Sequence, residues 1–99
     1  MKKAISKQEL EGLQRQNPSV KLIDIRPAAE YEKMHIPGSI NIPADTISEA
    51  ISGISKSDTI VCICTKGLER SQDAAESISS MGFDNVYYLK EGVTGWLHP

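Results

Sequence analysis

The stretch that decides the fold is Thr59-Ile60-Val61-Cys62-Ile63-Cys64-Thr65-Lys66-Gly67-Leu68-Glu69-Arg70-Ser71. It opens with a short apolar run rich in β-branched side chains, which is typical of a strand covered on both faces. It ends where a second pattern begins, because apolar residues then recur at helical spacing from position 71 to position 81, before a glycine. The stretch therefore predicts a strand, a short loop and a helix in succession.

Similar patterns lie on both sides of this stretch. Apolar runs at 20–25 and 86–89 predict two further strands. Ser6-Lys7-Gln8-Glu9 is a capping-box signature that predicts a helix to about Gln14, and isoleucines at helical spacing predict another helix over 45–54. Strands that alternate with helices indicate an α/β fold, with a mostly parallel sheet and helices on both faces.

The composition limits the classes of protein to consider. A chain of 99 residues is the usual size of one domain, so residues 1–99 are expected to form a single domain. The chain is also expected to be a monomer. A formal charge of −2 with scattered lysines argues against nucleic acid as a main partner. We find no apolar run long enough for a signal peptide or a membrane span. The expectation is that the chain is complete, has no membrane partner and lies in the cytoplasm.

Cys64 is the main candidate for chemistry. It stands at the end of a predicted strand, before a loop that contains Gly67 and leads into a helix. Backbone amides and the helix dipole point into such a loop, form an anion cradle and favour a thiolate. Arg70 adds a planar guanidinium that can bind two oxygens of one oxyanion, and Gly67 allows the backbone to turn inward. The candidate anion-binding loop consists of Thr65, Lys66, Gly67, Leu68, Glu69, Arg70 and Ser71.

The second cysteine and the histidines carry weaker signals. Cys62 and Cys64 are one residue apart on a predicted strand, where a mutual disulfide would be strained, so both are expected as free thiols. Cys62 is interpreted as a core residue. Neither His35, interpreted as a turn residue, nor His98 lies near the cysteines in sequence, so we expect no metal site and no cofactor.

The order of motifs resembles that of a known family. Residues 22–31 (Leu-Ile-Asp-Ile-Arg-Pro-Ala-Ala-Glu-Tyr) and 35–43 (His-Ile-Pro-Gly-Ser-Ile-Asn-Ile-Pro) resemble the N-terminal signature of rhodanese domains. The cysteine loop and the segments at 82–87 and 89–96 are similar to the rest of the family pattern, so the resemblance covers nearly the whole chain. It implies the rhodanese fold, with a five-stranded parallel sheet between helices.

The resemblance also implies an activity. A rhodanese-type Cys64 would accept sulfane sulfur from a donor such as thiosulfate, hold it as a persulfide and pass it to cyanide or a thiol. Loop amides would hold the persulfide, and Arg70 would steady the departing oxyanion. Asp24 and Arg26 would be polar support at the neighbouring strand end, most simply as a structural ion pair or cap.

Two departures from the family pattern keep alternatives open. Glu91 stands where family members usually have the first of two glycines. The larger departure is the loop, since most sulfurtransferases of the family have four residues between cysteine and arginine and this chain has five. That longer loop is used by cysteine phosphatases and by arsenate reductases of this fold, and Glu69 is the sequence-local candidate acid. A sulfurtransferase is the leading interpretation, followed by phosphatase or arsenate reductase, and by a non-catalytic binding or sulfur-relay module with a protein partner.

Overall fold

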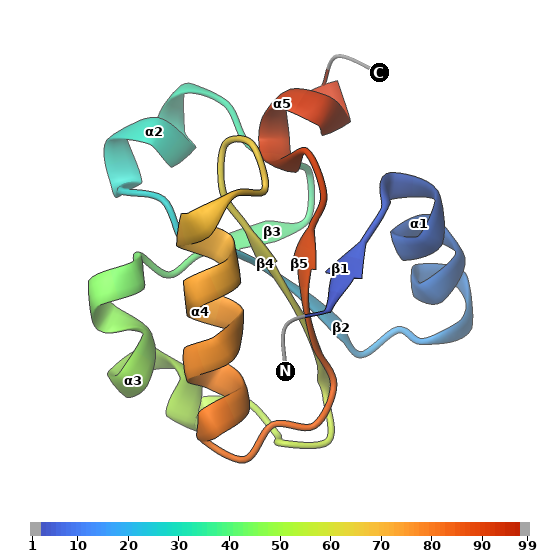
Figure 1. Ribbon diagram of the computed structural model, residues 1–99, viewed down its shortest axis with the longest axis vertical. Coiled ribbons are helices and arrows are strands. Elements are labelled where there is room, and N and C mark those ends of the chain that lie inside the picture. Colours follow the sequence, from blue (N-terminus) through green and yellow to red (C-terminus); the bar gives the residue numbers. More distant parts are fainter. Residues whose placement is uncertain (1–2, 98–99) are drawn as a thin grey trace.

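The computed structural model describes residues 3–97, and within them five strands form one sheet in the order β1-β5-β4-β2-β3 (Figure 1). The strands are β1 (Ala4–Ile5), β2 (Val20–Asp24), β3 (Ser39–Asn41), β4 (Thr59–Ile63) and β5 (Val86–Leu89). Every neighbouring pair is parallel, which confirms the predicted α/β class with a five-stranded parallel sheet. The carboxyl ends of the strands therefore meet at one edge of the sheet.

Helices connect the strands. They are α1 (Lys7–Gln16), α2 (Ala28–Lys33), α3 (Ile47–Ala50), α4 (Glu69–Ser80) and α5 (Gly92–Leu97), with 3₁₀ turns η1 (Ala44–Thr46) and η2 (Ile51–Gly53) beside α3. The capping box predicted at Ser6 is present, since its hydroxyl accepts from the Glu9 amide at 3.1 Å and the Glu9 carboxylate accepts from the Ser6 amide at 2.9 Å. Among residues 3–97 no helix has the length and apolar character needed to cross a membrane.

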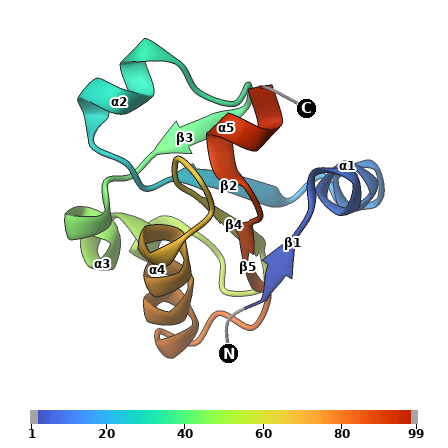
Figure 2. The same cartoon turned by 45° about the horizontal axis from the view of Figure 1, so that its top comes forward.

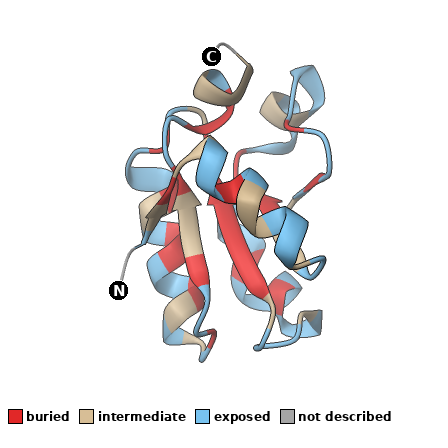
Figure 3. Cartoon of the chain, turned by 90° about the vertical axis from the view of Figure 1, so that its right-hand side faces the viewer, coloured by how far each residue is buried: buried red, intermediate tan, exposed pale blue. Residues whose placement is uncertain are grey.

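The two faces of the sheet bury separate clusters of apolar residues. Side chains of β4 alternate between them, because successive residues of a strand point to opposite faces. Ile60, Cys62 and, just past the strand end, Cys64 join the cluster under α3 and α4, whereas Val61 and Ile63 join the cluster that includes Leu10 of α1 and Val93 of α5. All five residues of β4 are buried, as the apolar run predicted, and Figure 3 shows the buried residues concentrated on the strands.

Some elements differ from the sequence prediction. The segment predicted as one helix over 45–54 is a short α-helix between two 3₁₀ turns, and Ile47 and Ile51, about one α-helical turn apart, are its buried residues. α4 begins at Glu69, two residues before the predicted start, so Arg70 lies in its first turn. β1, β3, α2 and α5 were not predicted from the residue patterns, since each is short and α2 buries no residue.

The loop between β4 and α4 lies at the carboxyl edge of the sheet. Figures 1 and 2 show it between α2 on one side and α5 on the other. Two segments distant in sequence from the loop thus flank it.

Candidate active site

Cys64 lies immediately after β4, only 3% exposed, in an open hollow of about 590 Å³. The residues that line the hollow are Cys64, Thr65, Lys66, Leu68, Glu69, Arg70 and Gln72. All come from the loop and the first turn of α4, as expected from the sequence. Two residues predicted at the site, Gly67 and Ser71, are buried and do not line the hollow.

Hydrogen-bond donors converge on Sγ of Cys64. While the thiol is protonated, Sγ donates to Oγ of Ser71 at 3.1 Å, and that hydroxyl donates to the carbonyl of Leu68 at 3.2 Å; in the thiolate the Ser71 hydroxyl can donate to Sγ instead. Burial by itself disfavours the thiolate. Hydrogen bonds from the Ser71 hydroxyl and from the backbone amides of Ser71, Leu68 and Gly67 outweigh that burial and lower the pKa of Cys64 below its ordinary value. The arrangement of the loop therefore favours the thiolate form of Cys64.

Two glycines let the loop pack against the turn between β5 and α5. Gly67 has φ +69°, and a methyl group there would overlap the carbonyl oxygen of Leu89, while one at Gly92 (φ +57°) would overlap that of Cys64. The amides of Val93 and Thr94 donate at 3.0 Å to the carbonyls of Cys64 and Thr65 respectively. These contacts hold the start of the loop, so the inward turn predicted at Gly67 is confirmed and its partner is the backbone of residues 89–91.

Glu91, the departure from the family glycine, keeps the backbone conformation that glycine favours. Its φ is +63°, the one positive value among the described non-glycine residues. Its side chain lies over Gly95, where a methyl group would overlap Cβ of Glu91. The missing glycine is thus accommodated by a second glycine one helical turn later.

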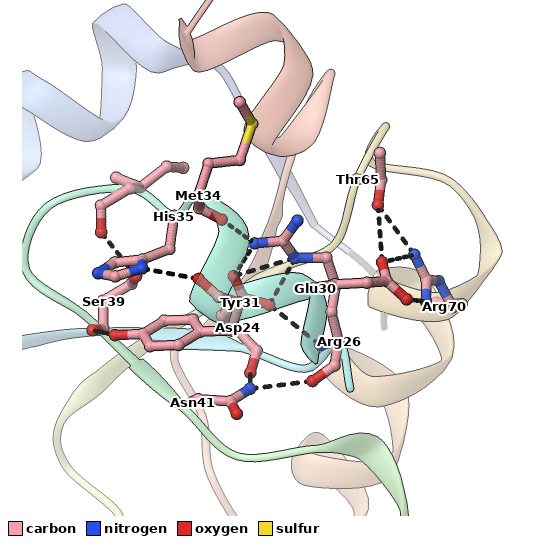
Figure 4. Close-up of polar contacts among 11 residues, drawn as sticks. Asp24, Arg26, Glu30, Tyr31, Met34, His35, Ser39, Asn41, Thr65 and Arg70 are labelled. Atoms are coloured by element: carbon pink, nitrogen blue, oxygen red, sulfur yellow. Dashed lines mark hydrogen bonds and ion pairs between the residues drawn. The ribbon is translucent and has the colours of Figure 1, made fainter. Parts of the chain in front are cut away.

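Arg70 lines the hollow but its guanidinium is already paired (Figure 4). Nη2 donates to Oγ1 of Thr65 at 2.9 Å and to Oε1 of Glu30 at 3.3 Å, and Nη1 donates to Oε2 of Glu30 at 3.5 Å. Thr65 also donates to the same carboxylate at 3.4 Å. The hydrogen bond from Arg70 is the main cause that lowers the pKa of Glu30. Arg70, which the sequence predicts to bind an oxyanion, therefore lines the hollow with a carboxylate as its partner.

Asp24 and Arg26 form a buried ion pair at the end of β2, as the structural interpretation predicted. Nη2 of Arg26 lies 2.7 Å from Oδ2 of Asp24 and donates at 2.8 Å to the carbonyl of Met34, just past α2. Asn41 donates to the carbonyls of both residues of the pair. The pKa of Arg26 is raised, first by the hydrogen bonds to Asp24 and to a smaller extent by the nearby charge of Cys64. The pair anchors both ends of α2 beside the site.

The remaining candidates lie as follows. Lys66, Leu68 and Glu69 are exposed on the rim of the hollow. Cys62 is fully buried, and burial raises the pKa of its thiol to about 12, which agrees with its interpretation as a core residue. His35 follows α2 and stacks on Tyr31 with ring centroids 3.9 Å apart. No group of three metal-ligating side chains occurs within residues 3–97, and His98 lies outside the described residues.

Besides Gln72, which directly follows the predicted loop and lines the hollow, two contributors to the site were not singled out from the sequence. Glu30 lies within the stretch 22–31 that carried the family resemblance, so that motif contained a signal for it. Gly92 lies within the closing segment 89–96. Neither is near Cys64 in sequence, so their roles required the fold.

Comparisons with known proteins show the family to which the chain belongs. The family model for the rhodanese-like domain matches residues 6–99, and the chain belongs to that family. It is 32% identical over 83 residues to the thiosulfate sulfurtransferase GlpE of Tolumonas auensis, which covers 84% of this chain and 77% of GlpE. It is 35% identical over 78 residues to YrkF of Bacillus subtilis, whose name describes a sulfur carrier protein, which covers 79% of this chain but only 42% of YrkF.

Solved structures extend the similarity to three dimensions. The rhodanese-like domain protein of Staphylococcus aureus superposes with a TM-score of 0.83 at 26% identity, over 95% of this chain and 90% of that one. The arrangement of strands and helices is therefore that of the family, as the sequence resemblance implied.

Proposed function

We propose that this chain is a sulfurtransferase that carries sulfane sulfur on Cys64. The observation that carries the proposal is the set of donors aimed at Sγ, namely the Ser71 hydroxyl and the amides of Ser71, Leu68 and Gly67. They favour a thiolate in an open hollow, which is the form of cysteine that attacks sulfur. The similarity to GlpE supports thiosulfate as a donor.

The proposed reaction has two steps. The Cys64 thiolate attacks the outer sulfur of thiosulfate, a new S–S bond forms, and the old S–S bond breaks as sulfite leaves with the electron pair. The terminal sulfur of the resulting persulfide then carries the negative charge and lies in the ring of amides that held the thiolate. A nucleophile such as cyanide or a thiolate attacks that terminal sulfur and releases the Cys64 thiolate again.

The longer loop does not by itself make a phosphatase. A phosphatase would also need an acid that protonates the leaving oxygen. Glu69, the candidate acid near the loop in sequence, is exposed to solvent. We therefore expect detectable thiosulfate:cyanide sulfur transfer and negligible hydrolysis of aryl phosphates.

A sulfur-relay role uses the same persulfide with a protein as donor or acceptor. The similarity to YrkF supports this version of the proposal, in which turnover with small molecules is slow. The persulfide on Cys64 is common to both versions, so it is the species to measure first.

Intact-mass spectrometry after treatment with thiosulfate tests the proposal. We expect the mass of one added sulfur atom, which dithiothreitol removes. Cys64→Ser should show no addition, whereas Cys62→Ala should still show it because Cys62 is buried in the core. Robust phosphatase activity lost in both Cys64→Ser and Glu69→Gln, without any added sulfur, would instead support the phosphatase.

A further inference from the structure

Arg70, which lines the hollow, forms a solvent-exposed ion pair with Glu30. Their side chains are 47% and 41% exposed, and their shortest contact is 3.3 Å. Exposed ion pairs of this kind are weakly held, because water screens the attraction and both side chains lose freedom. A negatively charged ligand that enters the hollow can therefore compete with Glu30 for the guanidinium.

Glu30 is nevertheless held in position by its helix. The Arg26 side chain bonds to Asp24 at the end of β2 and to the carbonyl of Met34 after α2, and both members of that pair are buried. α2 is thus anchored, and its carboxylate at Glu30 points across to Arg70 and Thr65, which are 40 and 35 residues away in sequence (Figure 4). The buried ion pair between Asp24 and Arg26 therefore helps to fix α2 at the position where Glu30 meets Arg70.

We propose that Glu30 is a positioning residue that sets the anion selectivity of the site by competing with the oxyanion of the sulfur donor for Arg70. This inference rests on the proposed sulfurtransferase function. Glu30 keeps the guanidinium at the rim, so the cradle around Sγ favours a single sulfur over a tetrahedral oxyanion. A donor with a sulfonate end, such as thiosulfate, must displace Glu30 to gain both oxygen contacts of the arginine fork.

The variant Glu30→Gln tests this competition in the whole chain. Sulfate binding is measured first, as protection of Cys64 from iodoacetamide at constant ionic strength, which needs no enzymatic activity. Loss of an exposed ion pair predicts sulfate affinity about two- to fivefold higher than in the wild type. KM for thiosulfate should fall by the same factor while kcat stays within about twofold, since Glu30 acts before the chemical step.

Two controls separate competition for Arg70 from a general change of charge. Glu32→Gln removes the same charge from an exposed position on α2 and should leave sulfate affinity unchanged. In an Arg70→Ala background, Glu30→Gln should have no further effect, because the coupling passes through the guanidinium. Circular dichroism checks that each variant is folded.

Three results would overturn the inference. They are an equal gain in Glu32→Gln, an undiminished gain without Arg70, and the absence of sulfate protection in every variant. Failure of wild-type Cys64 to take sulfur from thiosulfate would instead refute the proposed function, and the sulfate measurements would still decide whether Glu30 competes for Arg70.

Discussion

Replacing Ser71 with alanine removes the hydroxyl that lies 3.1 Å from Sγ of Cys64. Ser71 is fully buried, so its hydroxyl is not in contact with solvent. The carbonyl of Leu68 keeps a partner, because the amide of Gln72 donates to it at 3.2 Å. The change therefore acts mainly on the thiolate.

The size of the effect follows from the charge of the acceptor. A hydrogen bond to a charged group is worth about 1.5–3 kcal/mol, and about 1.4 kcal/mol changes the thiolate fraction tenfold at a pH below the pKa of the thiol. A more basic thiolate is also a better nucleophile, which recovers about half of the loss on a logarithmic scale. We expect alkylation of Cys64 to slow about four- to fifteenfold at such a pH.

The assay is the rate of iodoacetamide labelling at Cys64 as a function of pH, read by peptide mass spectrometry. Ser71→Ala should move the midpoint of the profile to higher pH and reach a plateau at least as high as that of the wild type. Ser77→Ala, an exposed position on the same helix, serves as the matched control. An unchanged rate at acidic pH in Ser71→Ala would refute the reasoning and assign the stabilisation to the backbone amides alone.

Three further predictions concern stability, measured by urea unfolding. Gly92→Ala should lower the free energy of unfolding by more than about 2 kcal/mol, because the left-handed backbone and the overlap with the Cys64 carbonyl both oppose a side chain there. Gly53→Ala, which has open space around the added methyl group, should change it by no more than about 0.5 kcal/mol. Asp24→Ala should cost about 3–5 kcal/mol, because it leaves the buried charge of Arg26 unpaired; a loss below about 1 kcal/mol would contradict this. Between the ordinary thiol value of about 8.5 and the raised pKa of about 12, Cys62 is ionised only in the unfolded chain, so native stability falls as pH rises. The Cys62→Ala variant has no thiol at this position and lacks this pH-dependent loss. The difference in free energy of unfolding between the wild type and Cys62→Ala should therefore shrink by up to about 1.4 kcal/mol per pH unit in that range. A difference that stays constant with pH would contradict the prediction.

Strands with a strong local pattern were predicted from the sequence. β4 and β5 have the bounds that their apolar runs predicted, and β2 ends one residue earlier than predicted. Two-residue β1 and three-residue β3 are too short for a periodic pattern, and their place in the sheet comes from pairing with distant strands. The family resemblance, rather than periodicity, supplied the count of five strands.

The same division applies to the site. By itself the sequence determined that a cysteine would stand at the end of a buried strand, before a glycine-containing loop and a helix, because those signals are local. Tertiary structure decided what the loop faces. The orientation of Arg70 depends on Glu30, and the shape of the loop depends on Gly92 and the amides after it. These contacts join residues 28 to 40 positions apart in the sequence. The side-by-side pairing of parallel strands is what brings them to one edge of the sheet.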